Sequence, residues 1–303
     1  MVTFVYWSII VLSLVLPVLA VVIIFSATGK SRSRWLVRNV VGVLLMIFCY
    51  QAAIWAAYSV YLKYVFVAFT SAALVWSVVC PVRKTKRISP VGIMLCVLVS
   101  IPLIIGNVMA LRSHQSPSDE MMDLQFPLRN GTYYILQGGN SRLTNFFHGR
   151  WHWQELALDI VKLDKWGRRA SGLLPSDVAR YAIYADTVYS PCSGTVALDV
   201  DGQPEAVPPR MPRQGTLGNA IGIDNGKGLV VMAHLKPGSV MVRKGQRVVT
   251  GQPVGLVGNS GRSAEPHLHI MALTYLKGDA VRGTALPMRF DGRFLSLNDL
   301  VKN

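Results

Sequence analysis

The sequence predicts two regions of different fold class: an N-terminal, all-α region of four transmembrane helices and a C-terminal domain made mainly of antiparallel β-strands. Of the 303 residues, 51% are hydrophobic and only 16% are charged, whereas a soluble domain carries about 25% charged residues. Residues 1–111 contain no Asp or Glu, while residues 112–303 contain all 16 acidic residues and 22 of the 31 basic residues, a net charge of +6. A single uniform soluble domain is therefore excluded.

Four apolar runs define the predicted membrane region, residues 1–111. They span residues 4–26, 39–59, 64–82 and 90–111, each close to the ~20 residues that a helix needs to cross a bilayer. None contains an Asp or Glu, and Lys63 lies at the edge of a run. Ion and proton paths usually place an ionisable residue inside the membrane, so we expect these helices to act as an anchor.

The positions of the basic residues predict a topology. Eight of the nine bases in residues 1–111 lie in two segments, GKSRSRWLVR (29–38) and PVRKTKRIS (81–89), and short loops rich in Lys and Arg stay in the cytoplasm. The intervening link YSVYLKY (58–64) then lies on the outer side, as do the N-terminus and everything after Arg112. A nucleic-acid binder would carry its bases on a folded face, so no nucleic-acid partner is predicted despite the net charge of +15.

Residues 112–130, which include SHQSPSDEMMD, are expected to form a linker, and residues 131–303 the β domain. Gly and Pro separate short β-branched segments there, a pattern typical of antiparallel sheets with tight turns. The expected strands are TYYIL, LALDI, ADTVYSPCSGTV, NAIGID, GLVVMAHL, SVMV, QRVV, PVGLVG and HLHIMAL. The proline-rich segment between residues 199 and 218 is expected to be a surface loop.

The histidines indicate where the chemistry lies. Successive side chains of a strand alternate between its faces, so His267 and His269 of PHLHI should point to the same side. Asp159 lies among the apolar residues of LALDI, where a buried carboxylate needs a compensating partner such as a cation. Zinc prefers His nitrogen and Asp oxygen, and a catalytic zinc commonly has three protein ligands and one open position.

These motifs resemble the M23 (lysostaphin/LytM-type) zinc metallopeptidases over roughly residues 130–275. The resemblance rests on GNSGRSAEPHLHI, on the MAHL segment and the glycine-punctuated hairpins between it and GNSGRSAEPHLHI, and on the block HGRWHWQELALDIV. It implies an antiparallel β fold of the duplicated-hybrid, barrel-sandwich type. It also implies that Asp159 and His269 are zinc ligands, and that His234 and His267 are the catalytic pair.

The first zinc ligand is open between two histidines. The commonest family spacing, His followed by Asp four positions later, has no match here, because His148 lies eleven positions before Asp159 and His152 seven positions before it. NFFHGRWHWQELALD resembles a longer family variant, N-x-H followed by Q-x-x-A-x-D, with one additional residue after Asn145. We therefore favour His148 as the first ligand, and His152 would otherwise line a substrate groove.

The resemblance implies a zinc-dependent metalloendopeptidase, a hydrolase that cuts peptide bonds in the peptidoglycan cross-links of the cell wall. Combined with the topology, it predicts a multi-pass protein of the bacterial inner (cell) membrane, with both the N-terminus and the catalytic domain on the periplasmic or extracellular side. The sequence does not identify any protein partners.

The motifs are compatible with two other classes of function. Some members of the family have lost ligands and act as binding modules that activate other cell-wall hydrolases, but here the ligand set is complete. The hairpins of VRKGQRVVTGQPVGLV also resemble biotinyl or lipoyl carrier domains, with Lys244 before a turn glycine. A carrier domain would leave Asp159 and the two histidines of PHLH without a role.

Overall fold

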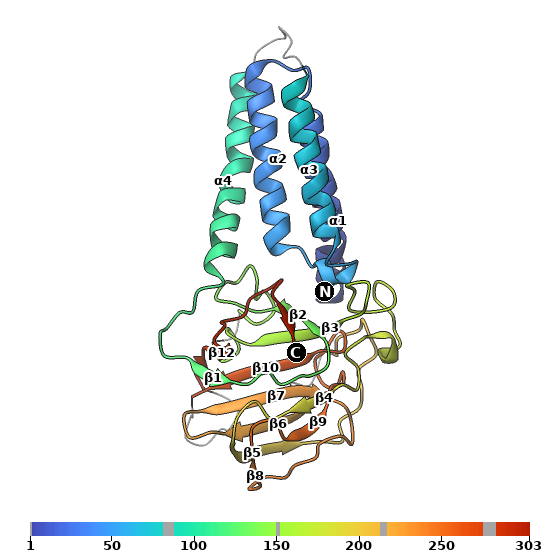
Figure 1. The fold of residues 1–303 in the computed structure, drawn as a ribbon, viewed down its shortest axis with the longest axis vertical. Coiled ribbons are helices and arrows are strands. Elements are labelled where there is room, and N and C mark those ends of the chain that lie inside the picture. The colour runs from blue at the N-terminus through green and yellow to red at the C-terminus, as the bar shows by residue number, and fades with distance from the viewer. Residues whose placement is uncertain (1, 81–87, 150–151, 213–216, 275–282) are drawn as a thin grey trace. The chain divides into compact units, whose positions relative to one another are not determined.

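The computed structural model describes residues 2–80, 88–149, 152–212, 217–274 and 283–303. They form two compact units, Phe4–Leu111 and, chiefly, Arg112–Asn303. The first is helical and the second is built from β-strands (Figure 1). The predicted fold class is confirmed: four apolar helices precede an antiparallel β-sheet domain.

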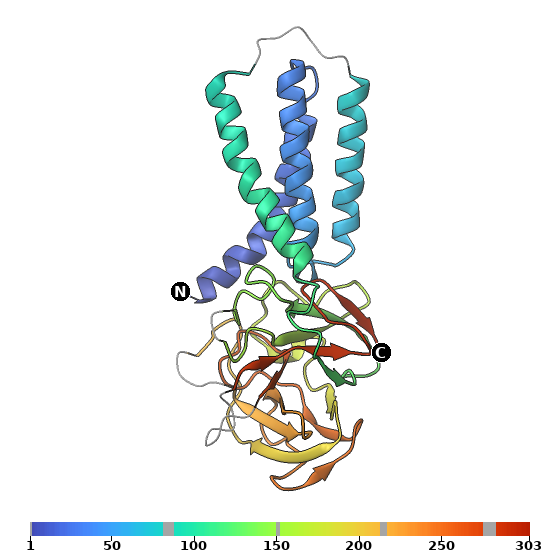
Figure 2. The same cartoon turned by 90° about the vertical axis from the view of Figure 1, so that its left-hand side faces the viewer.

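The helical unit contains four helices long and apolar enough to cross a membrane. They are α1 (Val2–Phe25), α2 (Arg32–Ala52), α3 (Leu62–Val79) and α4 (Pro90–Arg112), with a short 3-10 helix, η1 (Trp55–Ala57), before α3. Polar side chains join them: Trp35 of α2 donates through Nε1 to the carbonyl of Ser77 in α3 (2.9 Å), and Gln51 donates to the Asn107 side chain of α4 (2.7 Å). In both views α2 and α3 lie side by side (Figures 1 and 2).

The second helix differs from its predicted bounds of 39–59. It begins at Arg32 and ends at Ala52, so part of the expected basic loop 29–38 is helical. Arginine is a good helix former, and its long side chain can carry its charge away from an apolar helix; Arg38 thus donates to the carbonyl of Ser26 (3.0 Å). The connection to α3 accordingly moves to residues 53–61. The second basic segment, residues 81–87, lies outside the described residues.

The β unit is organised around one nine-stranded sheet. Its strands follow the order β13 (Leu300–Lys302), β2 (Thr132–Gln137), β3 (Leu158–Leu163), β10 (Leu268–Leu273), β7 (Leu229–Leu235), β6 (Asn219–Asp224), β5 (Gly194–Val200) and β8 (Arg247–Val248), with β11 (Ala285–Leu286) paired to β10. Figure 1 shows β2, β3, β10, β7, β6 and β5 in this succession. All these neighbours pair antiparallel.

Two small sheets complete the unit. One pairs β4 (Thr187–Tyr189) with β9 (Pro253–Leu256), and the other pairs β1 (Met122–Leu124) in parallel with β12 (Met288–Phe290). A second 3-10 helix, η2 (Val178–Arg180), lies between β3 and β4. The expected strand SVMV (239–242) is irregular in the structure.

The second half of the expected linker 112–130 is not a linker but part of the β unit. Ser113 is fully buried, residues 122–124 form β1, and Phe126 and Leu128 are at most 1% exposed in the core. Met122, Leu124, Phe126 and Leu128 alternate with Asp123, Gln125 and Pro127, and this alternation is typical of a half-buried strand. The polar residues 113–120 before it drew attention to a linker instead.

The sheet packs a core on each face. The main core includes Leu158, Ile160, Leu268 and Ile270, and the second core consists of Ala157, Leu217, Ala220, Leu229, Val231, Ala233, Met271 and Leu273. Asp159 and His269 alternate with main-core residues on β3 and β10, so both lie on the face of the second core. They are also direct partners in the β3–β10 register.

Candidate metal centre

Four imidazoles and one carboxylate meet in a buried cluster on this face of the sheet. Asp159 comes from β3, His269 from β10, His267 from the residue before β10, His234 from β7 and His148 from the loop before β3. All five are at most 7% exposed. The structure therefore brings together the five residues that the sequence analysis singled out.

Asp159 is the centre of the cluster. Its Oδ1 lies 3.0 Å from Nδ1 of His269, 3.2 Å from Nε2 of His267 and 3.4 Å from Nε2 of His148. Burial acts to raise the pKa of Asp159, but the neighbouring His148 and His267 and the hydrogen bonds from His267 and His269 hold its pKa well below the usual range. The carboxylate is thus ionised in a buried site.

His148 is held by Asn145. The amide nitrogen of Asn145 donates to the carbonyls of Glu155 (2.9 Å) and Ala157 (3.0 Å), which leaves its Oδ1 to accept from Nδ1 of His148 (2.8 Å). The proton of the neutral ring therefore lies on Nδ1, and the lone pair of Nε2 faces Asp159. Burial lowers the pKa of His148 to about 4, against the opposite effect of Asp159.

His152 lies outside this cluster. Its side chain is 92% exposed and faces Glu155, with 3.6 Å between Nδ1 and Oε2. Of the two histidines considered for the first ligand, the structure places only His148 beside Asp159.

His234 reaches the cluster through a bulge. On β7, Ala233 belongs to the second core, so strict alternation would direct His234 into the main core. Instead the register between β6 and β7 shifts and His234 adopts φ = 61°, after which Leu235 returns to the main core. The His234 ring then packs at 4.8 Å from the His267 ring and 5.6 Å from the His269 ring, measured between centroids.

Main-chain carbonyls orient the two predicted catalytic histidines. Nδ1 of His234 donates to the carbonyl of Ser260 (2.8 Å), and Nδ1 of His267 donates to the carbonyl of Glu265 (2.8 Å). Because a carbonyl only accepts, each ring keeps its Nε2 for the cluster. Burial and the neighbouring His267 and His269 hold the pKa of His234 well below its ordinary value. Burial acts to lower the pKa of His267, but Asp159 outweighs it and the pKa is raised.

The donor set fits a zinc ion. Tetrahedral zinc with bonds of about 2.0–2.2 Å separates its ligand atoms by roughly 3.4 Å. Oδ1 of Asp159 lies 3.4 Å from Nε2 of His148 and 3.0 Å from Nδ1 of His269. Two triads have donor atoms within 4.8 Å of one another: His148, Asp159 and His269, and also His234, His267 and His269. His269 belongs to both, and its Nε2 is buried with no hydrogen-bond partner among the described residues.

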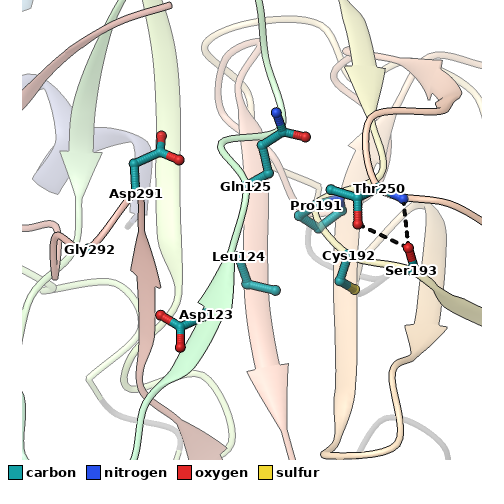
Figure 3. Close-up of a pocket in the computed structure, with 9 residues that line it drawn as sticks. All are labelled: Asp123, Leu124, Gln125, Pro191, Cys192, Ser193, Thr250, Asp291 and Gly292. Atoms are coloured by element: carbon teal, nitrogen blue, oxygen red, sulfur yellow. Dashed lines mark hydrogen bonds between the residues drawn. The ribbon is translucent and has the colours of Figure 1, made fainter.

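A separate pocket of about 420 Å³ lies beside β1, and the nine residues that line it include no histidine. Figure 3 shows Asp291 and Asp123 near one side of this pocket and Ser193 hydrogen-bonded to Thr250 at the other. Asp123 is ion-paired with Arg289. Lys244, the residue that a carrier domain would modify, lies in an exposed turn before β8.

Sequence reasoning missed the residues that orient the histidines. The sequence motif contains Asn145 but does not show that it orients His148. Ser260 and Glu265 act through main-chain carbonyls, which no pattern of side chains can predict. Arg169 and Glu265 form a buried ion pair 96 positions apart in the chain, a separation that no local pattern bridges.

The β unit is thus an antiparallel β domain with a buried cluster of one carboxylate and four imidazoles. Residues 179–282 match the model of Peptidase family M23, and the chain therefore carries an M23 domain, as its motifs suggested. His234, His267 and His269 lie within the matched residues, whereas His148 and Asp159 precede them.

Solved structures of similar proteins include a peptidase M23 from Pseudomonas aeruginosa (20% identity, 57% of this chain and 54% of that chain, TM-score 0.30). A zinc-containing peptidase from Vibrio cholerae is 23% identical over 50% of this chain and 36% of that chain, with a TM-score of 0.32. The catalytic domain of lysostaphin from Staphylococcus simulans is 21% identical over 33% of this chain and 68% of that chain, with a TM-score of 0.24. The chain thus spans about half of the first structure and about a third of the second. No curated protein sequence matches this chain.

Proposed function

We propose that this protein is a membrane-anchored zinc metalloendopeptidase that hydrolyses peptide cross-links of peptidoglycan. The observation that carries the proposal is the set of three short contacts from Oδ1 of Asp159 to His269, His267 and His148, 3.0 to 3.4 Å long, inside a buried site. A buried carboxylate surrounded by imidazole nitrogens supplies the donor atoms that a divalent cation such as zinc prefers.

His148, Asp159 and His269 are the proposed ligands. This triad combines one anionic oxygen with two nitrogens, so it offsets part of the charge of the ion, which the all-histidine triad does not. Zinc in such a site polarises a carbonyl and lowers the pKa of water to about 7. Asn145 keeps the proton of His148 on Nδ1 and so leaves Nε2 free to ligate.

His234 and His267 are the proposed catalytic pair. Each ring is fixed by a carbonyl at Nδ1, so Nε2 of each ring faces the cluster, where Nε2 of His267 lies 3.2 Å from Oδ1 of Asp159. One Nε2 accepts the proton of the attacking water, and a protonated Nε2 donates to the carbonyl oxygen as negative charge develops there or to the leaving amine. Both rings are buried, which strengthens these interactions.

The site is proposed to face the outside of a bacterial cell membrane. The four apolar helices supply the anchor, and the bases at residues 30–38 and 83–87 favour a cytoplasmic position for the loops after the first and third helices. The domain that follows Arg112 is then on the outer side of the membrane, where the cell wall lies. Single cysteine probes at Ser141 and Lys244 should react with an impermeant thiol reagent in intact spheroplasts, and the opposite sidedness would contradict this topology.

Bound zinc and peptide cleavage test the proposal together. The purified full chain in detergent should hold about one zinc per chain and release new amino termini from purified peptidoglycan. Replacing His148 or His269 with Gln should remove the zinc and the cleavage. Replacing His234 or His267 with Gln should retain the zinc and lower cleavage by about 100- to 10,000-fold.

His152→Ala is the matched control, because its side chain is 92% exposed, and it should leave both zinc and cleavage unchanged. Loss of zinc in the His234 and His267 variants, with retention in the His148 variant, would assign the metal to the all-histidine triad. A zinc-loaded wild-type chain that releases no termini would favour the non-enzymatic binding module.

A further inference from the structure

A buried ion pair lies next to the proposed catalytic pair. Nε of Arg169 donates to both carboxylate oxygens of Glu265, at 2.7 and 2.9 Å, and Nη2 of Arg169 donates to the carbonyl of Leu173 (2.9 Å). The two side chains are 0% and 2% exposed. Burying two charges costs desolvation free energy that their attraction often fails to recover, so stability alone is a weak reason for such a pair.

The main chain of Glu265 is part of the site. Its carbonyl accepts from Nδ1 of His267 (2.8 Å) and from the hydroxyl of Ser263 (2.8 Å). Glu265 thus carries two functions at once: its side chain is fixed by Arg169, and its carbonyl sets the tautomer and direction of His267. A displacement of Glu265 would move the acceptor that keeps Nε2 of His267 toward Asp159.

Arg169 reaches Glu265 because of the strand pairing. In the antiparallel β3–β10 register, His269 pairs with Asp159 and Leu268 with Ile160, so the chain after β3 runs beside the chain before β10. Arg169 follows β3 and Glu265 precedes β10. The ion pair therefore links the two chain segments that extend from the strands carrying Asp159 and His269.

The segment that carries Arg169 is itself well held. Ala170 and Tyr181 form an antiparallel bridge, the amide of Ala182 donates to the carbonyl of Arg169 (3.0 Å), and Tyr181 donates through its hydroxyl to the carbonyl of Pro175 (3.0 Å). The guanidinium is presented from a fixed backbone rather than from a free loop. Arg169 also lies outside the residues matched by the family, 179–282.

We infer that Arg169 and Glu265 are positioning residues, whose ion pair fixes the carbonyl that orients His267. The inference rests on the proposed function for its effect on catalysis, but its structural part concerns only the His267 ring. Measuring both the His267 ring signal and cleavage therefore separates the role of the ion pair from the proposed function.

The test uses the full chain in detergent micelles, labelled with ¹⁵N in the histidine rings. The Nδ1–H of His267 should give a slowly exchanging signal in the wild type, assigned by its loss in His267→Gln. In Glu265→Ala and Arg169→Lys, we expect its exchange with solvent to accelerate at least tenfold. Glu265→Gln, which keeps an oxygen for Arg169, should retain more of the protection than Glu265→Ala. Cleavage should fall in kcat by about 10- to 100-fold, with KM changed less than twofold.

The matched control is Arg168→Gln. Arg168 is the next residue along the chain and pairs with Asp164 at 2.9 Å, but the two side chains are 39% and 27% exposed, so its loss should change neither the His267 signal nor kcat. Because removing one buried charge leaves the other unpaired, Arg169→Met combined with Glu265→Leu serves as a second variant that buries no charge. Zinc content of about one per chain reports that the variants are folded.

An unchanged His267 signal in the zinc-loaded single and double variants would overturn the inference. The outcome does not depend on cleavage: a wild-type chain that binds zinc but cuts nothing would overturn the proposed function, while the ring signal would still decide the role of the ion pair.

Discussion

The two halves of the buried cluster are oriented by different kinds of acceptor. In the proposed ligand half, which comprises His148, Asp159 and His269, the acceptor for His148 is the side chain of Asn145. In the proposed catalytic half, which comprises His234 and His267, the acceptors are the main-chain carbonyls of Ser260 and Glu265. A side-chain acceptor can be removed by one substitution, whereas a carbonyl can only be displaced. The two halves should therefore fail in different ways when they are mutated.

The largest effect is expected from Asp159, which belongs to the ligand half and also contacts His267 of the catalytic half. In Asp159→Asn the shape is kept but the negative charge is lost, so the site loses its anionic ligand and the contacts to His267 and His269 lose their electrostatic attraction. Zinc affinity should fall more than 1,000-fold and cleavage should become undetectable, measured by metal analysis after dialysis and by release of amino termini. Retention of one tightly bound zinc would show that Asp159 is not a ligand.

A smaller effect is expected from Asn145, which supports the ligand half alone. Asn145→Ala removes the acceptor for His148 and two donors to the chain before β3. Loss of a partner that orients a metal ligand typically weakens metal affinity about 10- to 100-fold. A competition titration with a zinc chelator measures this change, and restoring zinc saturation should restore most of the cleavage. His152→Ala, in the same segment, serves as the control; an Asn145 variant that binds zinc as tightly as the wild type would mean that His148 needs no such support.

The smallest effect concerns the pH dependence of stability and is measured on the metal-depleted chain. The pKa of His148 is about 4 in the metal-free fold and about 6.5 in an unfolded chain. The unfolded chain binds more protons between these values, so this stabilisation is complete above pH 6.5 and is lost as the pH falls toward 4. His234 acts in the same direction, whereas His267, with a raised pKa, contributes stability that is lost as the pH rises.

Urea unfolding of the metal-depleted chain, followed by hydrogen exchange of the strand peptides, should show a free energy of unfolding about 2 kcal/mol lower at pH 5 than at pH 7.5 from His148 alone. His148→Asn should remove most of this pH dependence, and His152→Ala should leave it intact. Equal pH dependence in the His148 variant and the wild type would contradict the assignment of a buried, neutral imidazole.

The sequence determined the division of the chain and the identity of the clustered side chains. Apolar runs of bilayer length without acids predict helices from composition alone, and the alternation around Asp159 and His269 places both on one face of their strands. The structure moved the second helix to Arg32–Ala52, because arginines extend a helix as readily as apolar residues do. It also folded residues 122–130, expected as a linker, into the core.

Tertiary structure alone decided how the cluster is assembled. The choice between His148 and His152 depends on a loop in which Asn145 bonds to the carbonyls of Glu155 and Ala157, and no periodicity encodes that contact. His234 enters the site only because a bulge with φ = 61° reverses the alternation on β7. The Arg169–Glu265 pair joins residues 96 positions apart. Side-chain type is local information that a sequence displays directly, whereas hydrogen-bond partners and strand register depend on the whole chain packing at once.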